Sequence, residues 1–409
     1  MAIRTQVGIV GAGPSGLLLS HLLHLEGIES VVLEIRSRRH VESRIRAGVL
    51  EQGTVDILRE TGLGDRLQRE GLVHHGIELR LEGQRHRIPL SELTAGRTLT
   101  IYDQQKVVND LAEARLAAGG QVQYEVADVR VDDLDSAAPT IHYRKDGAAH
   151  ELRCDVIAGC DGFHGVCRPS IPRGALTVYE RVYPFAWLGI LAAVHPSVEE
   201  MTYAPHDRGF ALHSLRSPEL SRLYLQCAVG EDLANWPDER IWDELAIRLG
   251  TDDGWTLKDG PILEKTLIAL RSFVVEPMQY GRLFLVGDAA HIVPATGAKG
   301  LNLAVVDVQI LAHAVAAFYR SGRADALDRY SEACLRRVWR IQQFSRWWTL
   351  ALHRFPGDDF RRRLQRSELE YLLASKAAAT SMAENYVGMP LDRPPALLAS
   401  MPREHAAPV

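Results

Sequence analysis

Short apolar runs alternate with a longer leucine-rich segment at the start of the chain. Residues 5–10 are apolar and lead into glycines, which predicts a buried parallel strand. Residues 14–26 carry many leucines and end at Gly27, which predicts a helix with a glycine stop. Residues 30–33 are a second apolar run that ends at Glu34. Together these segments predict a βαβ unit.

The hydrophobic pattern changes after about residue 186. From 186 to 227, short runs with aromatic and β-branched residues predict antiparallel strands of a second domain. Residues 282–286 return to an apolar strand pattern, and residues 300–319 have the amphipathic pattern of a long helix. Residues 324–382 are also helical by pattern. We therefore expect the first unit to be assembled from both ends of the chain, with the second domain inserted.

Composition narrows the class of protein without defining a site. The 409 residues are 46% hydrophobic and 24% charged, as in an ordinary globular enzyme, and they suffice for two or three interleaved units. The net charge of −5 argues against a nucleic-acid partner. The five cysteines are odd in number and scattered, which favours reduced thiols over disulfides, and their spacing predicts no metal site.

The hydrophobic pattern predicts no targeting or membrane segment. The N-terminus enters an apolar strand without a basic region and a cleavage site. The most apolar helix, residues 301–318, contains Asp307, Gln309 and His313, which argues against a span through lipid. We therefore expect a cytoplasmic protein with no membrane partner.

A glycine-rich turn separates the first predicted strand from the first predicted helix. Gly11 permits the tight turn, Gly13 lets the backbone approach a pyrophosphate, and Gly16 lets the helix pack on the strand. The helix N-terminus, which includes Ser15, offers free N–H groups to the anion. Glu34 ends the second strand, where its carboxylate can bind a ribose diol. This pattern predicts a dinucleotide site but does not separate FAD from NAD.

Two later segments favour FAD. Asp288 follows the strand at 282–286, where a carboxylate can bind the ribityl hydroxyls that FAD has and NAD lacks. Residues 294–300 form a loop entering a helix, whose N–H groups and dipole favour negative charge at a flavin ring. Between these motifs, residues 160–168 contain the Asp161-Gly162 element. Three ordered motifs are much more specific than any one of them.

With these motifs, the chain resembles the single-component flavoprotein aromatic hydroxylases over about residues 5–390. Within that family it is most similar to the members that hydroxylate 4-hydroxybenzoate. The stretches that carry this narrower resemblance are residues 44–53, 180–185, 270–278 and 384–388. The resemblance implies conversion of 4-hydroxybenzoate to 3,4-dihydroxybenzoate with FAD, NAD(P)H and O2.

The resemblance also implies the residues that bind and activate the phenolic acid. Ser214, Arg216 and Tyr224 match the residues that hold the substrate carboxylate, and Arg216 has the geometry for a bidentate contact. Ser214 and Arg216 share strand parity, and Tyr224 falls on the next strand, so all three are expected to face one pocket. The phenol end is matched by Tyr203, Tyr386, His74 and the backbone carbonyl of Ala295. A tyrosine pair and an imidazole can withdraw the phenol proton without admitting water.

Further matches concern the two nucleotide cofactors. The residues expected to hold FAD are Gly11, Gly13, Ser15, Gly16, Glu34, Arg44, Arg46, Gln104, Arg222, Asp288, Lys299, Gly300, Leu301 and Asn302. Those expected to attract the nicotinamide cofactor are Arg44, His164, Arg168 and Arg271. An arginine and tyrosine pair that often marks NADPH use is replaced by Ile35 and His40. Because Arg36, Arg38 and Arg39 remain, NADPH is favoured, with NADH open.

The expected architecture is an α/β fold with a Rossmann-like FAD-binding domain, an inserted antiparallel-sheet substrate domain and a helical C-terminal region. The predicted boundaries are 1–75, 98–180 and 268–322 for the FAD domain, 76–97 and 181–267 for the substrate domain, 323–391 for the helical region, and 392–409 for a flexible tail. Family members are commonly homodimers, so a homodimer is expected.

Two alternatives stay open from the sequence. A related hydroxylase of 4-aminobenzoate or 3,4-dihydroxybenzoate would share the carboxylate-binding residues. A non-catalytic nucleotide-binding sensor would have to explain why the tyrosines and Arg216 occur together. One departure from the family pattern is Ala295, where two consecutive prolines are usual. Alanine removes a restriction on φ, so a softer loop is expected.

Overall fold

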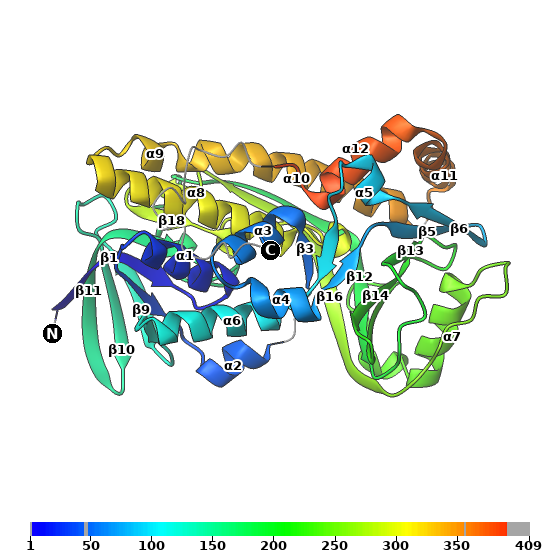
Figure 1. Cartoon of the computed structure of the whole chain (residues 1–409), viewed down its shortest axis with the longest axis horizontal. Helices are drawn as coiled ribbons and strands as arrows, with labels where there is room; N and C mark the ends of the chain where they lie inside the picture. The colour runs from blue at the N-terminus through cyan, green and yellow to red at the C-terminus, as the bar shows by residue number, and fades with distance from the viewer. Residues whose placement is uncertain (1, 45–47, 356, 391–409) are drawn as a thin grey trace, which may run out of the picture.

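The computed structural model describes residues 2–44, 48–355 and 357–390 (Figure 1). Its first sheet has the strand order β17-β18-β11-β1-β2-β8. β1 pairs in parallel with β2 and β11, β2 with β8, and β11 with β18, which confirms the predicted βαβ unit and the returning strand. The bounds are β1 Ala2–Val10, β2 Ser30–Leu33, β8 Gln121–Gln123, β9 Ala127–Asp132, β10 Thr140–Lys145, β11 Ala148–Gly159, β17 Gln279–Tyr280 and β18 Leu283–Leu285.

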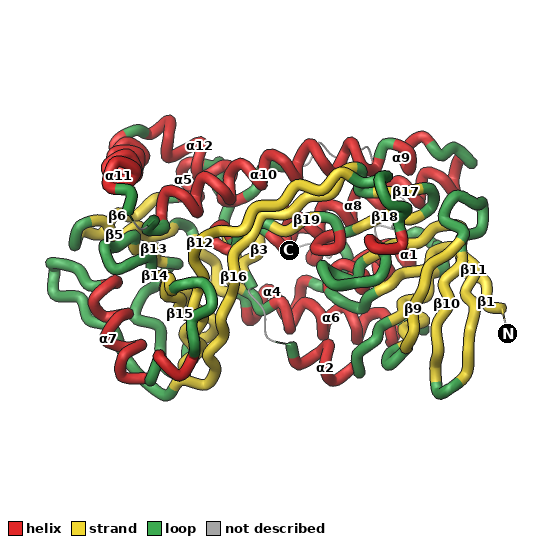
Figure 2. Tube along the Cα trace, turned by 180° about the vertical axis from the view of Figure 1, so that it is seen from behind, coloured by secondary structure: helices red, strands yellow, loops and turns green. Residues whose placement is uncertain are grey.

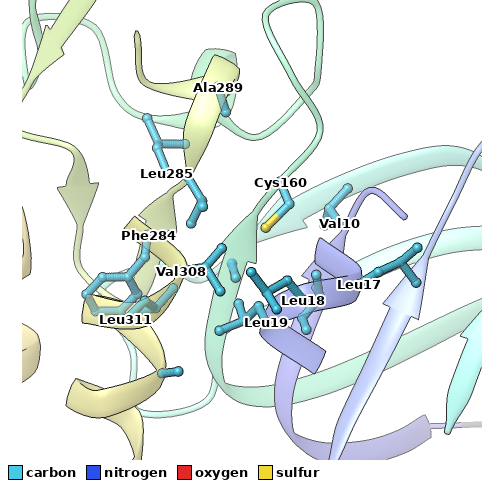
Figure 3. Close-up of a cluster of buried hydrophobic side chains, with 14 of the residues drawn as sticks. Val10, Leu17, Leu18, Leu19, Cys160, Phe284, Leu285, Ala289, Val308 and Leu311 are labelled. Atoms are coloured by element: carbon cyan, nitrogen blue, oxygen red, sulfur yellow. The ribbon is translucent and has the colours of Figure 1, made fainter. Parts of the chain in front are cut away.

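Helices from both ends of the chain cover this sheet. α1 (Pro14–Leu25) lies between α6 (Gln104–Ala117) and α8 (Gly300–Ser321). Figure 3 shows Leu18 and Leu19 of α1 on the side that faces Val308 and Leu311 of α8, with Phe284 and Leu285 of β18 nearby. Such burial of large apolar side chains contributes the main favourable term to the stability of this unit.

α8 is long and apolar enough for its length and composition alone to suit a membrane. Its most apolar window has a mean hydropathy of 1.7, and 67% of that window is buried inside the protein. The helix packs on α1, α9 and α10. α8 is therefore a helix of the protein core. The polar residues at 307, 309 and 313 had predicted that it does not span a membrane.

The second sheet has the order β19-β16-β12-β15-β14-β13-β5-β6. The predicted antiparallel strands of 186–227 are present, and one parallel pair, β13 with β5, joins the earlier segment to them. Two long strands of this second sheet, β12 and β16, run diagonally across the molecule and reach the side of the first sheet at one end (Figure 2). The bounds are β5 Ile77–Leu81, β6 Gln84–Ile88, β12 Thr177–Ala192, β13 Thr202–Ala204, β14 Ala211–Ser217, β15 Leu220–Cys227, β16 Ile262–Glu276 and β19 His291–Ile292.

The remaining elements complete the shell. A small sheet has the order β3-β7-β4, and helices follow one another after residue 324, as predicted. The domain boundaries remain a prediction, with residues 181 and 268 both lying inside continuous strands. The bounds are β3 Val49–Glu51, β4 Leu72–His74, β7 Leu99–Ile101, α2 Arg38–Ser43, α3 Gln52–Glu60, α4 Gly64–Glu70, α5 Leu90–Leu93, α7 Asp238–Leu249, α9 Asp325–Asp328, α10 Tyr330–Leu352, α11 Asp359–Ala374 and α12 Lys376–Val387.

A buried histidine fastens the end of α10 to the second sheet. The indole Nε1 of Trp187 donates a hydrogen bond of 2.6 Å to His353 Nε2, and His353 Nδ1 lies 2.8 Å from the carbonyl of Thr349. The imidazole stacks on Phe185 at a centroid distance of 4.4 Å. Burial lowers the pKa of His353 to about 3, so the ring is neutral and its Nε2 accepts.

Replacing His353 with Phe should change both stability and its pH dependence. The variant keeps the stacking but loses two hydrogen bonds, so its unfolding free energy at pH 7 should fall by about 1–3 kcal/mol. In the parent, the unfolded state takes up a proton below pH 6.5 that folded His353 takes up only near pH 3. This costs up to about 1.4 kcal/mol per pH unit in that window. Denaturant unfolding between pH 4 and 7 should show a variant slope smaller by one proton, whereas replacing exposed His40 with Gln should leave it unchanged.

Candidate functional site

Three glycine-containing turns meet where β1, β11 and β18 end. Gly11 has φ +103°, and a Cβ there would lie 2.4 Å from the carbonyl oxygen of Cys160. A Cβ on Gly16 would lie 1.9 Å from the carbonyl oxygen of Gly11, and one on Gly287 would lie 3.2 Å from Ser15 Oγ. The three motifs predicted from the sequence therefore assemble at one edge of the parallel sheet, as expected of a nucleotide site.

The N-terminus of α1 provides the expected anion position. Its N-cap, Gly13, makes no side-chain capping bond, and Pro14 follows in the first turn. No described heavy atom lies within 4 Å of a Cβ placed on Gly13, so a phosphate can approach the free N–H groups. Buried Glu34 accepts hydrogen bonds of 2.8 Å from the backbone N–H groups of Ala12 and Arg36, which fixes its carboxylate beside the turn.

A buried ion pair holds the turn that carries Asp288. Asp307 of α8 accepts a 3.0 Å hydrogen bond from the N–H of Gly287 and lies 2.6 Å from His291 Nε2. Burial disfavours the imidazolium, but the Asp307 charge and hydrogen bond outweigh it and raise the pKa of His291. Asp288 itself is exposed in the short helix η3 (Gly287–Ala289), where a ligand can reach it.

Three of the four residues predicted for the nicotinamide cofactor gather around Phe163. The guanidinium groups of Arg168 and Arg271 lie 4.7 and 4.8 Å from its ring centroid, and the exposed ring of His164 lies 4.9 Å from it. Arg168 also donates a 2.9 Å hydrogen bond to the carbonyl of Ala289 and so joins two cofactor motifs. The fourth residue, Arg44, is exposed at the end of α2.

Two residues predicted to hold FAD at the start of α8, Lys299 and Asn302, use their side chains for hydrogen bonds within the protein. Buried Lys299 donates to Glu51 Oε1 at 2.7 Å and to the carbonyl of Tyr386. Burial lowers the pKa of Lys299, and the Glu51 charge opposes that change. Asn302 accepts from the N–H of Glu51 at 2.9 Å and donates to the carbonyl of Val49. These bonds fix the helix N-terminus, where the N–H groups of Gly300 and Leu301 belong to the first turn and need no partner within the helix.

The strand register brings the predicted substrate residues onto one face of the second sheet. Tyr203 of β13 pairs with Leu212 of β14, which pairs with Tyr224 of β15. Ser214 pairs with Arg222 in the next row. Directly paired residues project to the same side, so Tyr203, Ser214 and Tyr224 lie on one face, whereas the shared parity of Ser214 and Arg216 stays a prediction. A register shift between residues 215 and 217 forms a bulge at Arg216, and bulges redirect side chains.

The predicted tyrosine pair is in direct contact. The hydroxyl groups of Tyr203 and Tyr386 are hydrogen-bonded to each other, and Tyr203 also donates to the carbonyl of Thr296 at 3.1 Å. Its hydroxyl lies 3.6 Å from the sulfur of Met201. Burial raises the pKa of both phenols, so both are neutral at pH 7.

His74 is connected to this pair through Met201 rather than by a direct bond. Its Nδ1 accepts a 3.3 Å hydrogen bond from the N–H of Met201, and its Nε2 is buried without a partner among the described residues. Burial lowers the pKa of His74 to about 4, with the charge of Glu200 opposing the shift. The imidazole is therefore a neutral base inside the protein.

The residues predicted for the carboxylate and flavin ends have identified partners. Buried Arg216 pairs with Asp103 at the start of α6, next to half-buried Gln104. Arg222 donates to the hydroxyl of Tyr224 at 3.4 Å. Ala295 begins the short helix η4 (Ala295–Gly297) and is exposed, and the carbonyl that meets Tyr203 belongs to the following residue. Arg46 lies outside the described residues.

Several residues of the site were missed from the sequence. Met201 sits two positions before Tyr203, directly ahead of β13, and this period-two spacing could have pointed to it. Asp103 adjoins Gln104 but had no pattern of its own. Phe163 follows the Asp161-Gly162 element directly, and its role as a platform for two arginines appears only in three dimensions.

Comparisons with known proteins agree with this geometry. The FAD binding domain family model matches residues 4–345. The p-hydroxybenzoate hydroxylase of Acinetobacter baylyi (strain ATCC 33305 / BD413 / ADP1) is 48% identical over 391 residues, which cover 95% of this chain and 96% of that protein. The chain belongs to the FAD binding domain family. FAD is thus its cofactor, with NAD(P)H as co-substrate, and the protein is a flavin-dependent aromatic monooxygenase.

More distant relatives share the family or the fold. The rifampicin monooxygenase of Streptomyces venezuelae is 26% identical over 315 residues, which cover 73% of this chain and 61% of that protein. The crystal structure of p-nitrophenol 4-monooxygenase PnpA from Pseudomonas putida DLL-E4 superimposes with a TM-score of 0.80 at 20% identity. That match covers 95% of this chain and 100% of the other, and it shows that the two proteins have the same fold.

Gly13 and Gly16 of the first turn should behave differently when each is replaced by alanine. Gly16→Ala forces its Cβ against the Gly11 carbonyl, so the unfolding free energy of the FAD-free protein should fall by about 1–3 kcal/mol. Gly13→Ala meets no described atom within 4 Å and should cost no more than about 1 kcal/mol as an N-cap change. It should still weaken FAD binding, measured by flavin fluorescence, because the methyl group occupies the space for the pyrophosphate. Unchanged FAD affinity in Gly13→Ala would place the phosphates elsewhere.

Proposed function

We propose that this protein hydroxylates 4-hydroxybenzoate at the 3-position to give 3,4-dihydroxybenzoate, using NADPH and O2. The observation that carries the proposal is that Tyr203 and Arg216 lie on neighbouring strands of the same sheet. A hydrogen-bonded phenol pair lies at one end and a buried guanidinium at the other, on strands β13 and β14. An aromatic acid with a para hydroxyl group has matching polar groups at its two ends. The 48% identity to a p-hydroxybenzoate hydroxylase supports the same substrate.

At the carboxylate end, Arg216 is the principal binding group in this proposal. A guanidinium carries five N–H donors, and the contact to Asp103 uses Nη1, so a carboxylate would share the cation with Asp103. Ser214 and Tyr224 lie on neighbouring strands and would add hydroxyl donors. Because the Arg216 side chain is buried, its attraction to an anion is weakly screened by solvent.

At the phenol end, Tyr203 would accept the substrate proton and, once its hydroxyl turns from the Thr296 carbonyl to Tyr386, pass its own proton on to Tyr386. Both tyrosines stay neutral at pH 7 because burial raises their pKa values, so they can relay a proton without holding charge. Neutral His74 is the base at the far end of this path, and a water molecule would be needed between His74 and the pair. The carbonyl of Thr296 orients the Tyr203 hydroxyl.

Bound FAD supplies the oxygen chemistry, and the protein supplies its position and surroundings. Gly11, Gly13, Ser15, Gly16 and Glu34 would hold its nucleotide half. Residues proposed for the rest of FAD are Arg44, Arg46, Gln104, Arg222, Asp288, Lys299, Gly300, Leu301 and Asn302. The backbone N–H groups at the α8 N-terminus favour negative charge on the flavin ring.

For the nicotinamide cofactor we propose NADPH over NADH. The exposed cations Arg36 and Arg39 follow Glu34 in the chain, and Arg38 is already paired with Glu42 at 2.5 Å. A 2′-phosphate near this segment would meet positive charge. His164, Arg168 and Arg271 would attract the pyrophosphate from the side of Phe163. We further propose a cytoplasmic homodimer that binds neither nucleic acid nor a membrane.

Product identification is the direct test. The FAD-loaded protein with O2, NADPH or NADH, and a panel of 4-hydroxybenzoate, 4-aminobenzoate and 3,4-dihydroxybenzoate should form 3,4-dihydroxybenzoate from the first substrate at the highest kcat/KM, with NADPH preferred. Arg216→Gln should raise KM for 4-hydroxybenzoate by about 10- to 100-fold, the loss of one or two charged hydrogen bonds. The control Arg208→Gln, at an exposed arginine, should leave the KM for 4-hydroxybenzoate unchanged.

Two outcomes would contradict the proposal. Faster product formation from either other acid would reassign the substrate within the family. Absence of substrate-stimulated NAD(P)H oxidation in FAD-loaded protein would leave the nucleotide-binding sensor as the better explanation. An unchanged KM in Arg216→Gln would remove Arg216 from the carboxylate site even if the product is as expected.

Restoring proline at residue 295 should reduce wasteful peroxide release. Pro294 has φ −59° and ψ 141°, the extended conformation that a following proline requires, so Ala295→Pro should fit. The stiffer loop would hold the Thr296 carbonyl against Tyr203 more steadily. The ratio of peroxide to hydroxylated product should fall, while the control Ala295→Ser, which keeps φ free, should leave it unchanged. Equal ratios in all three proteins would count against a role for loop stiffness.

A further inference from the structure

An aspartate is paired with the guanidinium group that the proposed function assigns to the substrate carboxylate. Oδ1 of Asp103 forms an ion pair with Nη1 of Arg216. Asp103 directly precedes α6, and Arg216 lies on β14, 113 positions further along the chain. The two side chains are 27% and 6% exposed, so solvent screens this attraction only in part. An acid that binds at Arg216 therefore meets a negative charge of the protein itself.

The carboxylate of Asp103 makes this contact instead of a more usual one. Asp103 is the N-cap residue of α6, with φ −55° and ψ 132°, and its side chain makes no capping hydrogen bond. An aspartate at an N-cap normally accepts from the N–H two or three positions further on, which here belongs to Gln105 or Lys106. The N-terminus of α6 thus offers the Asp103 carboxylate a second position.

The backbone at Asp103 is held in place, so the two positions differ by a rotation of the side chain. The N–H of Tyr102 donates to the carbonyl of Gly48 at 2.8 Å. A Cβ placed on Gly48 would lie 2.6 Å from Cα of Asp103, which shows how closely the two segments pack. The carbonyl of Asp103 accepts from the N–H groups of Lys106 and Val107 at 2.9 and 3.2 Å. Rotation about the Cα–Cβ bond moves the carboxylate without breaking these contacts.

Electrostatic repulsion connects the two positions to ligand binding. A substrate carboxylate that shares the Arg216 guanidinium lies close to the Asp103 carboxylate. Like charges repel more strongly in a poorly solvated site than in water. Rotation of Asp103 to the N-terminus of α6 relieves this repulsion, and the positive end of the helix dipole stabilises the carboxylate there. Binding of an acid at Arg216 and the Asp103–Arg216 pair therefore oppose each other.

We propose that Asp103 competes with the substrate carboxylate for Arg216 and so sets the affinity of the site for acids. Without a ligand, Asp103 pairs with Arg216, as observed. When an acid binds, the Asp103 carboxylate turns to the N–H groups of α6. The inference rests on the proposed function, in which Arg216 binds the substrate carboxylate. The product has the same carboxylate as the substrate, so the competition weakens the binding of both and speeds product release.

Equilibrium binding to the FAD-loaded protein without NADPH tests the competition. Asp103→Asn keeps the shape of the side chain and its ability to cap α6 but removes the charge. The Kd values of 4-hydroxybenzoate and of 3,4-dihydroxybenzoate, followed by flavin absorbance, should each fall by about tenfold, the factor for 1.4 kcal/mol. The Kd of neutral 4-hydroxybenzamide should change by less than about twofold, which also shows that the variant is folded. Glu113→Gln, at an exposed residue of α6, is the matched control and should leave all three Kd values unchanged.

Hydrogen exchange at the start of α6 tests the second position of Asp103. In the parent protein, saturation with 4-hydroxybenzoate should slow exchange of the Gln105 amide, because the released carboxylate accepts from the first turn. Asp103→Ala should bind the acid without this slowing, since alanine cannot cap the helix. Equal slowing in Asp103→Ala and in the parent would overturn the movement of Asp103 to α6.

The binding results separate this inference from the proposed function. A larger Kd of 4-hydroxybenzoate in Asp103→Asn would overturn the competition and make Asp103 a support for Arg216. An equal gain for the acid and the amide would overturn the role of charge. Both results count against Asp103 alone, provided that Arg216→Gln weakens binding of the acid. If Arg216→Gln leaves the Kd of 4-hydroxybenzoate unchanged, the proposed carboxylate site is wrong and the inference fails with it.

Discussion

The structure depends on a buried junction between the loop at residues 294–300 and the tyrosine pair. Tyr203 of the second sheet donates to the Thr296 carbonyl, and Lys299 donates to the carbonyl of Tyr386. Lys299 is buried with Glu51, which also pairs with Arg337. A buried ammonium requires such partners, because an unpaired charge inside a protein is very costly. The junction therefore fixes the loop at residues 294–300 relative to the tyrosine pair.

Around that junction, neutral buried groups and groups that attract anions occupy different positions. The buried groups proposed to meet the substrate phenol are neutral, since burial raises the pKa values of the two tyrosines and lowers that of His74. The positions expected to meet anions present donors instead, at the N-terminus of α1 and at Arg216. In the proposed function, the proton would move among neutral groups, while the carboxylate and the phosphates would bind at groups that donate hydrogen bonds. His353 continues the neutral interior behind the substrate sheet.

Most of the fold was predictable because its parts follow local rules. The βαβ unit, the strand at 283–285 and α8 appear as predicted. The period of the hydrophobic pattern and the glycines that end elements are both signals that lie within a few residues. The parallel β5–β13 pair was not predictable, because β-pairing between distant segments leaves no local pattern. For the site, the glycine turns and the tyrosines were predictable by motif and resemblance. Met201, Asp103 and Phe163 were not, because their roles arise from neighbours that are distant in the chain.

The amino-acid sequence by itself determined the dinucleotide turns, the order of strands and helices, and the residue types that an aromatic acid and FAD require. Only the tertiary structure decided which of those side chains face a ligand and which tie the scaffold together. Lys299 and Asn302 are hydrogen-bonded to Glu51, and Arg168 donates to the carbonyl of Ala289. The physical reason is that a polar side chain takes the partner that folding brings within hydrogen-bond reach, and that partner is set by packing between segments remote in sequence.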